Sequence, residues 1–584
     1  MMKFNTPVIL RDSFTRTWLR FENPARVICA RSLAEVLPCL REVETCVDKN
    51  GWHAAGFISY EAAPAFDSAL TVRDAGGFPL LWFGLYPSVQ HSQALEQDSA
   101  GWQVDTWQPT VSRESYNAAI QHVKDQIAHG RTYQVNYTFR LRNQFSGSPW
   151  ALFVDMVNAQ APGYSAYLDT GEHVICSASP ELFFKMDGET VTCRPMKGTT
   201  PRGLTLEQDE EQAAWLRASS KNRAENVMIV DMIRNDLGRL ARTGSVRVPE
   251  LFVTERYPTL WQMTSGVTAE IPSSFSEIMT ALFPCASITG APKVSTMQII
   301  AALETTPRRI YTGAIGYLSP GRRAQFSVAI RSLLLEKATG SAEYGIGGGI
   351  VWDSTSRDEY AEALLKARVL TKRNPVFSLL ETLGWTPGQG FTLLEEHLER
   401  MRSSAIYFDF PFAPSQAISA LEKAAEKGEL APQPLRVRLL LGRTGDLQVE
   451  TYPFQRLENP PKVSLKLARA PIDPGNLFLY HKTTHRMFYE EARKGVTGCD
   501  DVILYNENAE ITETSIANLV FELNGELVTP PVHCGLLPGT LRAHLLAEGK
   551  IREQVVLLSD LPNCTRIWLI NSLRGWREAQ LLPG

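Results

Sequence analysis

The sequence lacks the features that mark membrane-spanning, secreted and nucleic-acid-binding proteins. No apolar run is long enough to cross a bilayer, and because charged residues recur from Arg11 onward, we expect no signal peptide. Acidic and basic residues nearly balance, giving a net charge of −4 at pH 7. The overall electrostatic field therefore favours neither nucleic acid nor a membrane as a partner. An acidic substrate would have to be bound by arginines at the site itself.

Cysteine patterns that mark metal sites or disulfide frameworks are also missing. The nine cysteines are scattered, and none lies in a Cys-x-x-Cys pair or at a spacing typical of metal ligands. This distribution is typical of free thiols in a reducing compartment, so we expect a cytoplasmic protein. Internal repeats and low-complexity tracts are absent as well.

Length and turn residues indicate two domains of the α+β class. At 584 residues the chain is too long for one ordinary core. Helical and strand-like segments alternate up to about residue 370, and the pattern changes after residues 371–375, where Pro375 disfavours continuation of a helix. The sequence therefore predicts one domain over residues 1–372 and another over residues 373–584.

Three segments give definite local predictions. Residues 207–240 have the apolar spacing of one long helix or a pair of helices, closed by Gly238. Ser356-Arg357-Asp358-Glu359 has the pattern of a capping box and predicts a helix that runs to about residue 372. Asn524-Gly525 predicts a hairpin turn between strands within residues 501–530.

The most informative string is residues 195–203, with the sequence PMKGTTPRG. Its Pro and Gly residues predict a rigid turn, in which Gly198 and Thr199 can present backbone N–H groups to an anion. Lys197 would become a usable amine nucleophile if burial lowered its pKa. On these nine residues alone, a solvated lysine beside a turn is the simpler interpretation, and the rest of the chain reverses that preference.

Two glutamates on separate predicted helices are candidates for ion binding. The helical neighbours of Glu225 are largely apolar, so its carboxylate would be partly buried and would need a partner. Glu362 has Lys366 one turn later, and the pair could equally be an ordinary ion pair on a solvated helix face. The residues alone leave both interpretations open.

Together these strings resemble the chorismate-utilising enzymes over nearly all of residues 110–372. The string FPCASITGAPK at residues 283–293 adds to the resemblance, although Cys285-Ala286 stands where the family more usually has Gly-Gly. The resemblance implies an α/β sandwich that binds chorismate, with Mg²⁺ held by Glu225 and Glu362. The substrate contacts that it implies are Gly198, Thr199, Tyr311, Arg331, Gly347, Gly348 and Gly349.

The resemblance also implies catalytic roles and a nucleophile. Lys197 is typical of the aminodeoxychorismate synthase branch, and Glu181 matches the general acid that protonates the departing C4 hydroxyl. Gln134 stands where isochorismate synthases place a water-activating Lys, and Gln262 where anthranilate synthases typically place a His. Neither amide can do acid–base work, which fits ammonia as the nucleophile and an aminated product.

Ammonia would have to come from elsewhere, since no cysteine lies in the Gly-x-Cys-x-Gly turn of class I amidotransferases. We therefore expect a separate glutamine amidotransferase subunit as a partner.

Residues 374–584 resemble the fold-type IV enzymes that depend on pyridoxal phosphate. The resemblance implies that Lys482 holds the cofactor covalently and that Glu513 keeps its ring nitrogen protonated. It implies that Arg400 and the helix start at Thr540 bind the phosphate. Thr382 matches a threonine that assists proton transfer in aminodeoxychorismate lyases. Taken singly, these residues could be a surface lysine, a glutamate at a strand edge and a solvated arginine on a helix. Their order and spacing, however, repeat the family's pattern.

The two resemblances together favour a bifunctional enzyme. The first half would aminate chorismate to 4-amino-4-deoxychorismate, and the second half would eliminate pyruvate to give 4-aminobenzoate, a folate precursor. An anthranilate- or isochorismate-type synthase fused to an amino-acid aminotransferase stays open, as does a catalytically silent docking module. The lyase assignment rests on the fusion rather than on motifs. The sequence leaves open the oligomeric state, including whether the second half forms a homodimer. It also leaves open whether the intermediate is channelled between the sites and whether the N-terminal region binds an amino acid.

Overall fold

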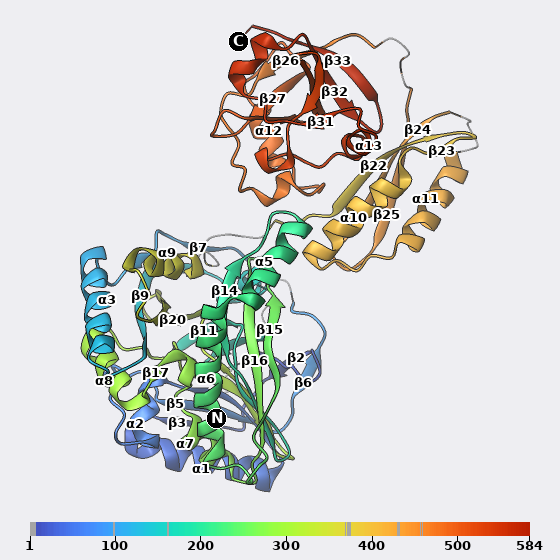
Figure 1. Cartoon of the computed structure of the whole chain (residues 1–584). Helices are drawn as coiled ribbons and strands as arrows, with labels where there is room; N and C mark the ends of the chain where they lie inside the picture. Colours follow the sequence, from blue (N-terminus) through green and yellow to red (C-terminus); the bar gives the residue numbers. More distant parts are fainter. Residues whose placement is uncertain are drawn as a thin grey trace. The chain divides into compact units, whose positions relative to one another are not determined.

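Figure 1 presents the computed structural model, which describes residues 7–583 except 97, 99, 161–162, 368–369, 371–374, 429–432, 456 and 458–459. The chain divides into two compact units. The first lies within Met1–Pro201 and Ala213–Asn374, and the second within Arg202–Gln212 and Pro375–Gly584. Nothing in the sequence pattern indicated that residues 202–212 would group with the later unit.

Two antiparallel sheets form the first unit. The strands of one sheet are β1 (Val8–Arg11), β2 (Trp18–Phe21), β6 (Gln90–Ser92), β7 (Trp102–Val104), β8 (Gln108–Pro109), β9 (Gln134–Gly147), β10 (Tyr164–Asp169), β11 (His173–Ser179), β17 (Gly290–Ala291), β20 (Ser332–Glu336) and β21 (Ser341–Ile350). Their order is β17-β9-β21-β20-β11-β10-β1-β2-β6, and β7 and β8 also pair with β9.

The strands of the other sheet are β3 (Arg26–Ala30), β4 (His53–Ile58), β5 (Leu81–Tyr86), β12 (Leu182–Asp187), β13 (Thr190–Arg194), β14 (Met196–Pro201), β15 (Arg247–Arg256), β16 (Leu260–Glu270), β18 (Ala314–Ser319) and β19 (Arg323–Val328). Their order is β14-β16-β13-β12-β19-β18-β4-β5-β3, with β15 paired to β16.

Side-chain alternation explains how the sheets pack. On β1, Val8 and Leu10 enter one hydrophobic core together with residues of the second sheet, whereas Ile9 enters a second core on the opposite face. Successive side chains of a strand point to opposite faces, so one sheet can contribute to both cores. This layered arrangement of sheets and helices confirms the predicted α/β sandwich of the first half.

The helices up to residue 374 are α1 (Leu33–Asn50), η1 (Tyr60–Ala62), α2 (Ala63–Phe66), α3 (Arg113–Ala128), α4 (Pro149–Gln160), α5 (Leu206–Ala218), α6 (Ser220–Gly238), α7 (Phe275–Leu282), η2 (Ala286–Ile288), α8 (Lys293–Leu303) and α9 (Ser356–Ala367). The helical segment predicted at 207–240 is thus a pair. The break lies at Ser219, whose hydroxyl accepts a hydrogen bond from the Asn222 backbone N–H and so caps α6.

The predicted capping box at Ser356 is wrong by one residue. The Thr355 hydroxyl accepts from the Asp358 backbone N–H at 3.2 Å and also donates to the Asp358 carboxylate. Thr355 therefore caps α9, because it stands three residues before the N–H that needs an acceptor. The helix is described to Ala367, and most of the predicted linker at 371–375 lies outside the described residues.

The second unit contains a small sheet and a larger one. The small sheet, in the order β23-β22-β24-β25, consists of β22 (Leu379–Thr386), β23 (Gly390–Phe391), β24 (Leu435–Leu441) and β25 (Leu447–Pro453). Helices α10 (Leu394–Phe408) and α11 (Pro414–Gly428) pack on it. On β24, Val437 and Leu439 enter the core beneath these helices, whereas Arg436 and Arg438 belong to the opposite face.

The larger sheet consists of β26 (Val463–Leu467), β27 (Asp501–Tyr505), β28 (Ile511–Thr514), β29 (Asn518–Leu523), β30 (Glu526–Thr529), β31 (Arg552–Glu553), β32 (Arg566–Asn571) and β33 (Gly575–Leu581). Its order is β28-β27-β26-β33-β32-β29-β30-β31. The remaining helices are η4 (Leu477–Leu479), α12 (Met487–Arg493), η5 (Val532–Cys534), α13 (Thr540–Ala547) and η6 (Leu558–Asn563). The predicted hairpin turn is confirmed, since Asn524 (φ 53°) and Gly525 (φ 81°) join β29 to β30.

Among the described residues, no helix combines the length and the apolar character that a membrane span requires.

Two candidate active sites

A cavity of about 530 Å³ in the first unit brings together every site residue predicted for the first half. Strand β14 contributes Lys197, Gly198 and Thr199, while the glycines of β21 form another part of the wall. The other predicted residues in its lining are Glu181, Glu225, Tyr311, Arg331 and Glu362. Residues far apart in the sequence therefore form one site.

Lys197 lies at the surface of this cavity in an environment that favours its neutral form. Burial lowers the pKa of the Lys197 amine, although the charges of Glu225 and Glu181 oppose that shift. A Cβ on Gly349 would lie 2.0 Å from Gln134 Nε2 and 3.0 Å from Lys197 Nζ, so glycine allows β21 to pass this close. The neutral amine is the form that can attack carbon.

Glu181 is buried and suited to giving up a proton near neutral pH. Its Oε1 accepts a hydrogen bond of 2.6 Å from the Ser287 hydroxyl. Burial raises the pKa of Glu181 to about 7, against the opposing effects of Ser287 and Lys197. A carboxyl group with this pKa can act as a general acid at neutral pH.

Tyr311 and Arg331 provide polar groups for an anionic ligand. Burial raises the pKa of Tyr311 to about 12, so its hydroxyl stays neutral and can donate a hydrogen bond. Arg331 donates from Nη1 to Gln160 Oε1 at 2.8 Å, and its backbone φ of 51° is rare for a residue with a side chain. A guanidinium held by an amide in this way can pair with a carboxylate through its other nitrogens.

Besides Glu181, three carboxylates line the cavity, on two helices. Glu225 lies on α6, and Glu359 and Glu362 lie on α9. Glu362 pairs with Lys366 at 2.8 Å, which lowers the pKa of Glu362, and Lys366 also donates to the Gly347 carbonyl. The ion pair considered from the sequence is therefore present, and its glutamate still faces the cavity.

The donor set fits Mg²⁺, which prefers oxygen ligands and completes its shell with water and substrate oxygens. No group of three or more acidic, His or Cys side chains in the described residues is already assembled as a metal cage. Glu225 and Glu362 would thus need the substrate to complete such a site. Glu359, which accepts from the Ser354 hydroxyl at 2.7 Å, was missed, although its position one turn before Glu362 was a signal.

Sequence reasoning also missed the positioning role of two residues, Gln262 and Asn226, that hold Lys197 and its turn. Gln262 donates from Nε2 to the Gly198 carbonyl at 2.8 Å and accepts from the Thr199 hydroxyl at 3.1 Å. The Asn226 amide donates to the Lys197 carbonyl at 3.5 Å and accepts from the Ser265 hydroxyl. These side chains hold the turn that presents Lys197, and no string in the sequence indicated this role.

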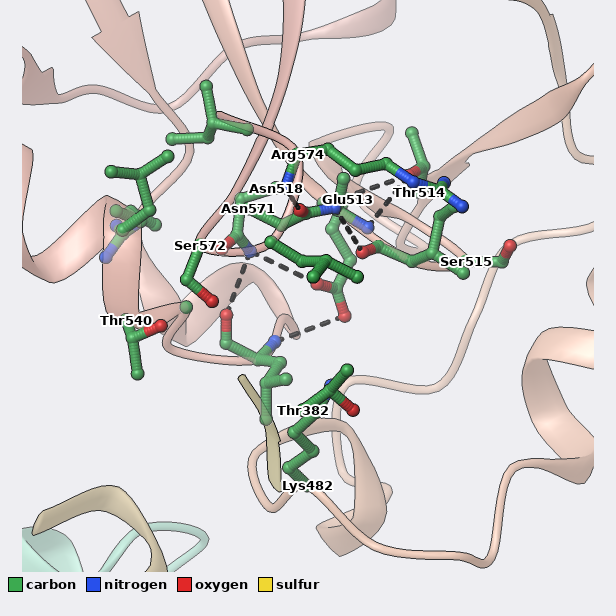
Figure 2. Close-up of a pocket in the computed structure, with 18 of the residues that line it drawn as sticks. Thr382, Lys482, Glu513, Thr514, Ser515, Asn518, Thr540, Asn571, Ser572 and Arg574 are labelled. Atoms are coloured by element: carbon green, nitrogen blue, oxygen red, sulfur yellow. Dashed lines mark hydrogen bonds between the residues drawn. The ribbon is translucent and has the colours of Figure 1, made fainter. Parts of the chain in front are cut away.

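A second cavity, of about 380 Å³, lies in the second unit. Figure 2 shows it with Thr382 and Lys482 near one another and Glu513 opposite. Its lining includes all five residues predicted for the second half, which are Thr382, Arg400, Lys482, Glu513 and Thr540. Thr382 and Glu513 lie on strands of the two sheets, Arg400 and Thr540 lie on α10 and α13, and Lys482 lies in the loop after η4.

Lys482 follows η4, and its backbone carbonyl accepts from the Leu380 N–H at 2.9 Å on β22. Burial lowers the pKa of the Lys482 amine to about 8, and the positive charge of Arg400 adds to that effect. A lysine with this pKa has a sizeable neutral fraction near pH 8, which is the form that condenses with an aldehyde.

Glu513 is buried and held by three donors. Its carboxylate accepts from the Tyr489 hydroxyl at 2.6 Å, from the Asn518 amide at 3.1 Å and from the Leu537 N–H at 3.1 Å. Burial nevertheless raises the pKa of Glu513 to about 7. A nearby cation, such as a protonated ring nitrogen, would favour its charged form.

Arg400 lies in a network that the sequence did not indicate. It donates from Nε and Nη2 to the buried Glu381 carboxylate at 2.8 and 2.6 Å, and from Nη1 to the Pro538 carbonyl. His397 bonds the same carboxylate at 2.6 Å and the Ser572 hydroxyl at 2.8 Å. Glu381 therefore fixes two side chains of α10 at the edge of the cavity.

The start of α13 has the geometry of a phosphate site. Thr540 is its first residue, and its hydroxyl lies 3.3 Å from His397 Nε2. A Cβ on Gly539 would lie 1.9 Å from Asn518 Oδ1, so glycine lets the backbone approach closely. The free N–H groups of a helix start favour an anion. With a buried amine and a buried carboxylate facing the same cavity, the donor set fits pyridoxal phosphate.

Comparison with known families agrees with both sites. Residues 6–372 match the model of the chorismate binding enzymes, and residues 378–582 match that of amino-transferase class IV. These matches confirm the two resemblances drawn from the sequence strings.

Two relatives illustrate the similarity. Aminodeoxychorismate synthase component 1 of Escherichia coli (strain K12) is 41% identical over 269 residues, which are 46% of this chain and 59% of the relative. Anthranilate synthase component 1 of Methanothermobacter thermautotrophicus is 32% identical over 342 residues, covering 54% of this chain and 73% of the relative. The chain thus spans about three-fifths of the aminodeoxychorismate synthase relative's length.

Among solved structures, anthranilate synthase component I from Streptococcus pneumoniae superposes with a TM-score of 0.52 at 22% identity. The match covers 64% of this chain and 93% of that one. It supports the fold of the first unit alone.

Proposed function

The chain belongs to the chorismate binding enzyme family and carries an amino-transferase class IV domain, and from this premise we propose that it makes 4-aminobenzoate in two steps. The domain over residues 1–372 aminates chorismate at C4 to 4-amino-4-deoxychorismate. The domain over residues 373–584 then removes pyruvate from that product. The observation that carries the proposal is Lys197 with a lowered pKa beside buried Glu181 in one cavity.

The amination balances as two substitutions. The neutral Lys197 amine forms a bond to the substrate ring while the C4–OH bond breaks, and Glu181 gives its proton to the hydroxyl, which leaves as water. Ammonia then forms the C4–N bond and displaces the lysine amine, and its surplus proton returns to Glu181. The net change is chorismate plus ammonia to 4-amino-4-deoxychorismate plus water.

The other residues of this cavity would bind and orient chorismate. Arg331 would pair with one carboxylate, and Tyr311 and the Gly198-Thr199 turn would donate to substrate oxygens. Glu225 and Glu362 would hold Mg²⁺, which supplies positive charge to a substrate carboxylate when bound. Gln134 provides no base for water, and Gln262, already engaged with Gly198 and Thr199, provides none for pyruvate release.

The second cavity supports elimination of pyruvate to give 4-aminobenzoate. Bound pyridoxal phosphate would supply an electron sink for the carbon that bears the amine. Lys482 would hold the cofactor and move protons at that carbon, with the Thr382 hydroxyl assisting. Glu513 would keep the ring nitrogen protonated, while Thr540 and Arg400 would bind the phosphate.

The decisive test is to identify the aromatic product. Incubating the chain with chorismate, ammonium, Mg²⁺ and pyridoxal phosphate is expected to yield 4-aminobenzoate and pyruvate. Glutamine is expected not to replace ammonium, because none of the nine cysteines lies in an amidotransferase nucleophile turn. Adding an amidotransferase subunit should restore activity with glutamine.

Other outcomes would contradict specific parts of the proposal. Anthranilate as the product would favour the synthase named among the relatives that match this chain over 54% of its length. Use of glutamine by the purified chain alone would contradict the need for a partner. We further place the reaction in the cytosol, which fits nine cysteines that are all free thiols.

Glu225→Gln and Glu362→Gln are each expected to raise the Mg²⁺ concentration for half-maximal amination, by roughly tenfold or more, because each removes a charged oxygen ligand. The measurement is an Mg²⁺ titration of chorismate consumption. Asp231→Asn on α6 is the control, since this exposed carboxylate pairs with Arg234 and does not line the cavity. Unchanged titrations in both glutamate variants would remove the metal assignment.

A further inference from the structure

The cavity of the second unit contains more cationic side chains than the proposed chemistry uses. Its lining includes Lys482 and six arginines, whereas Glu513 is the one acidic residue in that lining among the described residues. The six are Arg400, Arg436, Arg438, Arg486, Arg542 and Arg574. Such a surplus of one sign needs either nearby acids outside the lining or an anionic ligand.

Acids outside the lining account for three of these arginines. Arg400 pairs with Glu381, Arg438 pairs with Glu450 at 2.8 Å, and Arg542 pairs with Glu553. A fourth, Arg486, donates to the Ser515 carbonyl and stacks over the ring of Tyr489.

Arg436 and Arg574 have no acidic partner within ion-pair distance in the described part of the chain. The Arg436 guanidinium lies over the Tyr452 ring, 4.6 Å from its centre, and its buried Nε has no hydrogen-bond partner among the described residues. Burial lowers the pKa of Arg574, and the charges of Arg577 and Arg436 lower it further, against the opposing charge of Asp501. Both guanidinium groups thus line the cavity without an acidic partner at ion-pair distance among the described residues.

The two arginines come from different parts of the same unit and line one cavity. Arg436 lies on β24, on the face that also carries Arg438, which is paired in register with Thr382. Arg574 lies in the turn between β32 and β33, two residues after Ser572 (Figure 2). Ser572 is the residue whose hydroxyl bonds His397. Both arginines therefore line the same cavity as Lys482 and Thr382.

We propose that Arg436 and Arg574 bind the two carboxylates of a dianionic amine, and so select it over an ordinary amino acid with one carboxylate. This inference rests on the proposed function and names the substrate class of the second site. 4-Amino-4-deoxychorismate carries one carboxylate on its ring and one on its enolpyruvyl group. Two unpaired planar guanidinium groups match two carboxylates, because each can make a charge-assisted fork with one of them.

The test compares a dicarboxylate with a monocarboxylate as unreactive probes. Isophthalate and benzoate are titrated into the whole chain loaded with pyridoxal phosphate, and binding is followed at the absorbance of that cofactor, which reports the second cavity. The wild-type chain is expected to bind isophthalate about tenfold or more tightly than benzoate. Arg436→Gln and Arg574→Gln should each weaken isophthalate binding roughly 10–100-fold, as expected for the loss of a hydrogen-bonded charge.

Two further variants make the result specific. Arg443→Gln, at an exposed arginine in the turn after β24 and outside the cavity lining, should leave both affinities unchanged. Arg436→Lys keeps the charge without the planar fork and should recover part of the isophthalate affinity.

Equal binding of the two probes by the wild-type chain, or a preference that survives both glutamine variants, would overturn the inference. The titration needs no turnover, so it separates this inference from the proposed function. A chain that prefers isophthalate but releases no 4-aminobenzoate would contradict the lyase assignment and leave the dianion site standing.

Discussion

Lys197→Ala is expected to lower amination of chorismate on the order of 100-fold or more, because it removes the nucleophile of the first substitution. The Lys197 amine lies close to Gly349, and burial lowers its pKa, whereas the Lys366 amine in the same cavity is bonded to Glu362 and to the Gly347 carbonyl. The measurement is the initial rate of chorismate consumption with saturating ammonium and Mg²⁺. Release of 4-aminobenzoate from supplied 4-amino-4-deoxychorismate should be unchanged, since Lys482 is intact.

Two variants separate nucleophilic attack from charge. Lys197→Arg keeps a cation near Glu181 and Glu225 but cannot attack, so it should be as inactive as the alanine variant. Lys337→Ala removes an exposed lysine that pairs with Asp169, and it should behave like the wild type because exposed ion pairs contribute little. Wild-type amination in Lys197→Ala would exclude the covalent role, and activity in Lys197→Arg alone would reduce it to electrostatics.

The sequence predicted which residues line the first cavity because the predictive strings are local. The turn with Lys197 and the glycines of β21 need only short-range rules, and the family pattern supplied their partners. Residues that act through folded geometry were missed. Gln262 lies 64 residues from the Gly198 carbonyl that it bonds, and only the pairing of β14 with β16 brings the two together.

The same limit explains the second cavity and the helix ends. The Glu381 carboxylate meets His397 and Arg400 only after β22 and α10 pack together, so no spacing rule could indicate that network. The start of α9 at Ser356 was predicted correctly, but its cap was misplaced by one residue because Thr355 and Ser356 are both good caps. Only the position of the Asp358 N–H decides between them. Sequence rules thus find candidate groups, and packing decides which of them act on each other.

Lys482→Ala is expected to abolish both the absorbance of bound pyridoxal phosphate and the release of 4-aminobenzoate. The Lys482 amine, with a pKa of about 8, is the group suited to condensing with the cofactor aldehyde, and alanine has no amine to replace it. Each unit has hydrophobic cores of its own, so the lesion should spare amination. Chorismate and ammonium should therefore be converted to 4-amino-4-deoxychorismate, which accumulates and can be quantified by chromatography.

The outcomes of this experiment separate the two halves of the proposal. Adding a free aminodeoxychorismate lyase to the mixture should convert the accumulated intermediate to 4-aminobenzoate. Lys462→Ala, at an exposed lysine paired with Glu578, is the matched control and should keep the full two-step activity. Continued release of 4-aminobenzoate by Lys482→Ala would exclude the second unit as the lyase. If no intermediate accumulates and the added lyase yields nothing, either the first unit makes a different product or its activity requires an intact second site. Lys197→Ala distinguishes these explanations when its lyase activity is assayed alone. Only coupling between the sites would impair both halves together.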